Sequence, residues 1–115
     1  MLEVNRVLNE RRATGVLYDL LTDVVRVLVA QPPGTVRTRT LTADLLLDAQ
    51  GFLVGVDVEP EAPSRTLVML GPHEQVARKT AARVGICSDA SGGVFEVRIG
   101  AARAAIRGNE KNPYV

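Results

Sequence analysis

The stretch DAQGFLVGVDV, residues 48–58, is followed 41 positions later by DASGGVFEVRI, residues 89–99. Each stretch opens with an Asp three residues before a Gly, a pattern typical of a tight turn in which the Asp carboxylate hydrogen-bonds the turn backbone. Apolar residues then recur at every second position, which is the period of a half-buried strand. The two stretches therefore predict two Asp-led turns, each followed by a strand, at Leu53–Val58 and Val94–Ile99.

The correspondence extends outward from these turns without a gap, because residues 26–58 align on residues 67–99 at the same offset. Val27–Val29 aligns on Val68–Leu70, so a strand is predicted at each place. The fold class predicted is all-β and mainly antiparallel. We expect a small sandwich or barrel-like sheet made of two repeated units of three to four strands, with a short N-terminal helix.

With 115 residues the chain has room for one domain. Its predicted parts are an amphipathic helix at 3–12, a first β-unit at 16–59, an extended connector at 60–65, a second β-unit at 66–107 and a flexible tail at 108–115. The helix is predicted because Val4, Val7 and Leu8 share one helical stripe. The connector is predicted from its prolines, which cannot donate backbone hydrogen bonds.

Within the units, Val24–Val29 is dense in β-branched residues and precedes QPPG at 31–34, which predicts a hairpin. Val36–Thr42 alternates like an exposed edge strand. Leu45–Leu47, Thr66–Leu70 and Val84–Ser88 are further predicted strands, and GPHE at 71–74 is a predicted turn. The segment Glu74–Arg83 fits either a helix or a strand, and the repeat favours a strand.

Composition excludes several classes of function. The formal net charge is +1 and the aromatic residues number four, so the chain offers neither a strong field nor stacking platforms for nucleic acid. Asp19, Asp23 and Arg26 interrupt the longest apolar run, so no membrane span is predicted, and a cytoplasmic location is expected. The single cysteine, Cys87, cannot form an internal disulfide and is interpreted as a core thiol.

The residues that carry chemistry are sparse. His73 is the sole histidine, and with Cys87 it does not supply the three or four ligands of a zinc site. No glycine-rich loop precedes a helix, so no nucleotide site is predicted. Asp48 and Asp89 are interpreted as turn residues. We therefore predict no catalytic residues, no cofactor and no metal, and a protein that is not an enzyme.

Two family resemblances bear on the fold. The residues Tyr18, Asp19, Asp23 and Val25–Val27, with GFLVGV at 51–56, resemble a short uncharacterised bacterial β-hairpin family that closes on Gly-x-Leu-Val-Gly-hydrophobic. Residues 48–58 also resemble the strand pair of the photoreaction-centre (PRC) barrel family. Both resemblances imply a β-fold, and neither brings catalytic residues to this chain.

The function predicted is a non-catalytic interaction or scaffold module that pairs with itself or with another protein. The candidate interaction surface consists of Val4, Val7, Leu8, Arg37, Arg39 and Leu41. A candidate motif in the tail consists of Pro113, Tyr114 and Val115. One alternative is a ligand-binding or enzymatic cleft between the two units, rimmed by His73, Glu74 and Arg78. A weaker alternative is nucleic-acid binding through Arg37, Arg39 and Arg78.

Overall fold

The computed structural model describes residues 7–32, 34–58, 64–89 and 93–106. These residues form eight strands and two single turns of 3-10 helix. The elements are β1 (Val7–Arg12), β2 (Gly15–Asp19), β3 (Val24–Leu28), β4 (Arg37–Leu47), β5 (Leu53–Val58), β6 (Ser64–Met69), η1 (His73–Gln75), β7 (Arg78–Ser88), β8 (Val94–Gly100) and η2 (Arg103–Ala105). The predicted all-β class is confirmed.

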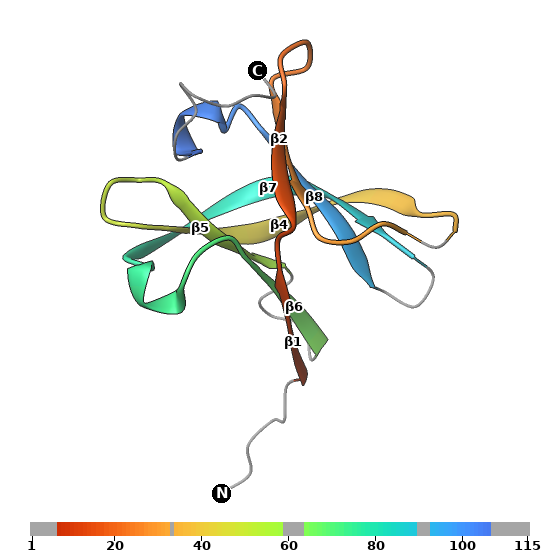
Figure 1. The fold of residues 1–115 in the computed structure, drawn as a ribbon, viewed down its shortest axis with the longest axis horizontal. Helices are drawn as coiled ribbons and strands as arrows, with labels where there is room; N and C mark the ends of the chain where they lie inside the picture. Colours follow the sequence, from red (N-terminus) through yellow and green to blue (C-terminus); the bar gives the residue numbers. More distant parts are fainter. Residues whose placement is uncertain (1–6, 33, 59–63, 90–92, 107–115) are drawn as a thin grey trace, which may run out of the picture.

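All eight strands belong to one sheet, in the order β1-β6-β5-β4-β7-β8-β3-β2. Every pairing is antiparallel except that of β1 with β6, which is parallel. The two outermost strands, β1 and β2, are consecutive in the chain, so the sheet must curl to bring its ends together (Figure 1). At their junction the Ala13 amide donates to the Met69 carbonyl and the Thr14 amide donates to the Leu28 carbonyl, at 2.9 and 2.7 Å.

Three strands of one β-unit, β3, β4 and β5, correspond to β6, β7 and β8 at an offset of 41 positions. The central strands β4 and β7 each have 11 residues, beginning at 37 and 78, and Thr42 pairs with its own equivalent, Arg83. Both are paired to the following strand with a register shift at the same place, after Leu46 in one half and after Cys87 in the other. Strands β3 and β6, which precede the two central strands in the chain, are exchanged between the β-units. β6 pairs with β5 of the first unit, and β3 pairs with β8 of the second.

Side chains alternate between the two faces of this sheet. One face, which we call the inner face, holds the main core, and the fully buried side chains at its centre include Val25, Val27, Val56, Val68 and Val97. β-branched side chains suit this environment because they pack well on a pleated surface. The opposite, outer face differs between the two halves, and the candidate site lies there.

The predicted N-terminal helix is wrong for the part that the structure describes. Residues 7–12 form β1, which pairs with β6 over its whole length. A helix of this length is marginal by itself, whereas the edge of β6 satisfies the backbone groups of the segment at once. Val7 and Leu8 therefore belong to a strand, and Val4 lies outside the described residues.

The predicted hairpin after Val24–Val29 is also wrong. β3 pairs with β2 and β8, and β4 pairs with β5 and β7, so the segment between β3 and β4 connects strands that are not neighbours. The 71–74 turn likewise leads from β6 to β7, which do not pair, and it contains η1. Local turn signals could not reveal that the first strands of the two halves are exchanged.

The prediction of an edge strand at Val36–Thr42 is also wrong, because β4 lies in the middle of the sheet, between β5 and β7. It is nevertheless one continuous strand with the predicted Leu45–Leu47. β5 pairs with β4 only from Ala43 of β4 onward, so residues 37–42 of β4 pair with β7 alone. In Figure 1 this first part of β4 projects beyond β5. The pattern of an exposed strand thus arose from a difference in strand length.

Other boundaries are closer to expectation. β5 has the predicted bounds, and β6 and β8 differ from theirs by one or two residues. Arg78–Arg83 is strand, as the offset favoured, but His73–Gln75 is a 3-10 turn. The predicted connector at 60–65 overlaps β6 at Ser64 and Arg65, and its residues 60–63 lie outside the described part of the chain, as does the predicted tail at 108–115.

Candidate functional site

On the outer face of the first half, the side chains form a small second core. Leu46, Val54, Leu67 and Met69 are buried together, and Val76 from the segment after η1 packs against them. We call these five residues the apolar patch. Strands β4, β5 and β6 each contribute to it, so it is a cross-strand cluster of the kind that stabilises a sheet.

The equivalent positions in the second half carry Cys87, Phe95, Arg26 and Leu28. These four residues do not fill the face; they line a pocket of about 350 Å³. We call it the Arg26 pocket. The full lining is Thr14, Arg26, Leu28, Ala30, Gln31, Pro32, Val36, Cys87, Phe95, Glu96 and Arg98. The pocket therefore lies in the half of the sheet formed by β7, β8 and β3. Of these strands, β3 comes from the first β-unit of the sequence, and β7 and β8 come from the second.

One pair of equivalent positions shows how differently the two faces are packed. A Cβ atom added at Gly55 would lie 2.7 Å from the Met69 sulfur and 2.9 Å from the Val68 carbonyl oxygen, so the apolar patch has no space for a side chain there. The equivalent of Gly55 is Glu96, and the equivalent of Met69 is the shorter Leu28. The second half therefore holds a charged side chain at a position where the first half has no room for any side chain.

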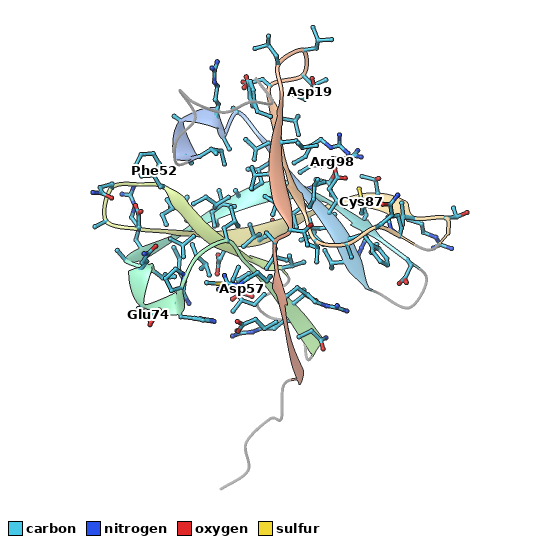
Figure 2. All side chains as sticks on the ribbon, in the orientation of Figure 1. Asp19, Phe52, Asp57, Glu74, Cys87 and Arg98 are labelled. Atoms are coloured by element: carbon cyan, nitrogen blue, oxygen red, sulfur yellow. The ribbon has the colours of Figure 1, made fainter. Side chains whose placement is uncertain are left out.

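Glu96 is the centre of an ion-pair network. Arg26 donates through Nε to Oε2 and through an Nη to Oε1, at 2.8 and 2.9 Å, and Arg98 donates through Nε to Oε2 at 2.7 Å. The Glu96 side chain is only 12% exposed, whereas those of Arg26 and Arg98 are 37% and 42% exposed. Figure 2 shows Arg98 on the same side of the molecule as Cys87.

The network changes the protonation equilibria of its members. Burial raises the pKa of Glu96, but the hydrogen bonds from Arg26 and Arg98 outweigh burial, so the pKa lies below its ordinary value. The hydrogen bond to Glu96 raises the pKa of Arg26, and the same cause raises the pKa of Arg98. All three groups are therefore charged at neutral pH, and the pocket carries one positive charge in excess.

Cys87, on β7, lies in the same region as this network. Its thiol is buried, as predicted, and its Sγ lies 3.4 Å from the Thr38 hydroxyl on the neighbouring strand. The prediction of a plain core thiol is incomplete, because Cys87 also lines the Arg26 pocket. Cys87 occupies the position of Leu46, so it is one of the smaller side chains that open the second face.

The residues predicted as an interaction surface are only partly brought together. Arg37 and Arg39 are exposed on the first part of β4, and Leu41 is half-buried and packs against the main core. Val7 and Leu8 lie in β1, at the far end of the sheet order from β2. Val4 and the tail motif of Pro113, Tyr114 and Val115 lie outside the described residues.

The alternative rim of His73, Glu74 and Arg78 does not border the Arg26 pocket. The His73 imidazole Nε2 lies 2.9 Å from Glu10 Oε1 on β1. Figure 2 shows Glu74 on the opposite side of the molecule from Cys87. The pocket that the structure contains is lined instead by residues of β3, β7 and β8 and of the segments beside them.

The two predicted turn aspartates have the expected role. Asp48 Oδ1 accepts from the amides of Gln50 and Phe52, each at 2.9 Å. Asp89 Oδ1 accepts from the amide of Gly93, also at 2.9 Å. Phe52 and Gly93 are equivalent at the offset of 41, so both Asp side chains accept a hydrogen bond from the amide at the same position.

Inspection of the residues alone missed the ion-pair network, although a signal was present. At the offset of 41 positions Arg26 aligns on Leu67, Glu96 on Gly55 and Arg98 on Asp57. Two of these pairs place a charged residue where the other half has Leu or Gly, and the third reverses the sign of a charge, which marks a face that has diverged. Only the exchange of β3 and β6 between halves brings Arg26 beside Glu96, 70 positions away in sequence.

Comparisons of the chain with protein-family models, with curated proteins and with solved structures found no match.

Within the described ranges, no group of three or more His, Cys, Asp or Glu residues is arranged to hold a metal ion. No helix in those same ranges is long and apolar enough to cross a membrane.

Proposed function

We propose that this chain is a non-catalytic binding module that takes a small molecule into the Arg26 pocket. The observation that carries the proposal is the difference between equivalent faces. The first half fills its outer face with the apolar patch, whereas the second half keeps an open pocket lined by two half-exposed guanidinium groups and a buried carboxylate. Pockets that combine apolar lining with a few placed polar groups are typical of ligand sites.

A purely structural network would not need the space that accompanies it. Replacing a buried ion pair by apolar residues of similar volume is often neutral or stabilising. The apolar patch shows that this same sheet geometry accepts such a solution. The Arg26 network is then best explained by what it can bind. We also propose that the two β-units derive from one duplicated unit, and that only the half of the sheet formed by β7, β8 and the exchanged β3 carries the binding function.

A variant that copies the first half tests this function. Arg26→Leu, Leu28→Met, Cys87→Leu and Glu96→Gly give the second half the residues found at Leu67, Met69, Leu46 and Gly55, while Phe95 stays at the position of Val54. We call this the filled-pocket variant. It should fold, because each residue is already accepted at the equivalent position. A library of small fragments, screened by amide chemical shifts, should perturb pocket residues of the natural chain and spare the filled-pocket variant. If no fragment binds in the pocket of the natural chain, the proposal fails.

A second candidate function is association with another copy or another protein, through the tip of the β2–β3 hairpin. Leu20 and Leu21 are 61% and 96% exposed, and they are the large apolar side chains that stand out in the described ranges. The tip is well ordered by hydrogen bonds, since Asp19 Oδ1 accepts from the amides of Leu21 and Thr22. An ordered turn that presents two leucines is suited to a protein contact.

Light scattering across micromolar concentrations tests this second function. If the hairpin tip mediates self-association, the natural chain should form a dimer or larger species, and Leu21→Asp should be a monomer. Thr40→Asp is the control, since it adds the same charge at an exposed position of β4, away from the leucines. A natural chain that stays monomeric at all concentrations contradicts self-association.

A further inference from the structure

The Arg26 pocket has the charge and the hydrogen-bond donors to hold an anion. Two arginines and one glutamate leave one positive charge in excess among the residues of its lining. Within the described part of the chain, Arg98 donates through its Nε–H alone, to Glu96, and Arg26 donates through Nε and one Nη group. The two Nη groups of Arg98 and the other Nη group of Arg26 therefore have donors for a ligand. Both side chains are partly exposed, so these donors are within reach of a ligand.

The rest of the pocket is suited to an apolar group. Leu28, Val36 and Phe95 line it together with Ala30 and Pro32. Its volume of about 350 Å³ lies at the small end of the roughly 300–1,000 Å³ range of ligand sites. A ligand of this size can have one short aliphatic chain or one aromatic ring beside its charged group.

The single excess charge discriminates between kinds of anion. A planar carboxylate matches the fork of a guanidinium and brings one negative charge. A phosphate group carries nearly two negative charges at neutral pH, and the adjacent Glu96 carboxylate would repel the second one. The charge of the pocket therefore fits a monocarboxylate better than a phosphate.

We propose that the Arg26 pocket binds a small organic monocarboxylate, with the carboxylate held by Arg98 and Arg26 and the apolar part against Leu28, Val36 and Phe95. This inference rests on the proposed function and adds the chemical class of the ligand. Glu96 then acts as a positioning residue, because it holds both guanidinium groups in one place before the ligand arrives.

Calorimetry with matched probes tests the inference. Hexanoate and benzoate are the carboxylate probes, hexanamide and benzamide are their neutral counterparts of the same shape, and inorganic phosphate tests the other anion. We expect the carboxylates to bind at least about tenfold more tightly than the amides, the difference that one charge-assisted hydrogen bond supplies. Phosphate should bind more weakly than either carboxylate.

Two arginine variants connect this preference to the pocket. Arg98→Gln should weaken carboxylate binding at least about tenfold, whereas Arg83→Gln, which removes an exposed arginine at the centre of β7, should leave it unchanged. Should Arg98→Gln fail to fold, Arg98→Lys keeps the charge without the planar fork and should also bind more weakly.

The outcomes separate this inference from the proposed function. Amides that bind in the pocket as tightly as carboxylates overturn the ligand class but leave the pocket as a binding site. Preferential binding of phosphate likewise overturns the class. Carboxylates that bind equally well to the natural chain and to Arg98→Gln overturn the assignment of the site. Binding of no fragment of any charge overturns the proposed function itself.

Discussion

Leu67 and Arg26 occupy equivalent positions on β6 and β3, yet one is buried in the apolar patch and the other pairs with Glu96 beside an open pocket. The central strands β4 and β7 have the same length, and each pairs with the strand that follows it with a register shift at the equivalent position. The inner face and the backbone ladder thus maintain the fold in both halves. The outer face is consequently free to differ. The first half has the apolar patch and the buried Asp57, 3.7 Å from Arg65, whereas the second half pairs Glu96 with two arginines beside an open pocket.

Gly55→Ala should have the largest effect on this comparison. The new Cβ would meet the Met69 sulfur and the Val68 carbonyl oxygen at less than 3.0 Å, and the carbonyl cannot move without disturbing the ladder. We expect a loss of about 2 kcal/mol in the free energy of unfolding, measured with urea. Gly85→Ala is the control, because its nearest neighbour lies 3.5 Å away, and its stability should be unchanged or slightly higher. Equal losses in both variants would show that the first face is not filled as described.

Glu96→Gln should have the next largest effect. The change leaves two guanidinium groups without their shared counter-charge, although both remain partly in water. We expect a loss of about 1.5 kcal/mol, less than for a fully buried pair because solvent screens the arginines. Glu74→Gln removes an exposed carboxylate as a control and should cost almost nothing. A Glu96→Gln variant as stable as the natural chain would mean that the network contributes no net stability.

The two Asp-led turns should respond alike, in contrast to the two faces. Asp48→Ala and Asp89→Ala each remove a carboxylate that accepts turn amides at 2.9 Å. We expect each variant to lose about 1 kcal/mol in thermal or urea unfolding. A loss several times larger in one turn than in the other would break the correspondence between the halves at the position where their sequences agree best.

The smallest predicted effect is a dependence of stability on pH. The folded pKa of Glu96 is lower than its ordinary value of 4.5, so the unfolded chain binds more protons between the two values. The contribution of Glu96 is therefore complete above about pH 4.5 and is lost as the pH falls through the folded pKa. The difference in unfolding free energy between the natural chain and Glu96→Gln should shrink in that acid range. A difference that stays constant down to pH 3 would contradict the lowered pKa.

Much of the local structure could be predicted from the residues, because it depends on neighbours in the chain. The Asp48 and Asp89 turns and the strand Leu53–Val58 follow from turn chemistry and from apolar periodicity. The predicted helix was wrong for residues 7–12, because these residues satisfy their backbone groups on the edge of β6, a partner more than 50 positions away. The edge strand at 36–42 was misplaced because strand length, rather than position in the sheet, exposes its first part.

By itself, the sequence determined an all-β chain with two corresponding halves, since turn residues and the period of two act over a few positions. Only the tertiary structure decided which strands are neighbours, because exchanging β3 and β6 leaves the local pattern of every strand unchanged. That exchange places Arg26 against Glu96 and creates the Arg26 pocket. The candidate site is therefore a consequence of long-range pairing, whose free energy comes from burying the shared inner face.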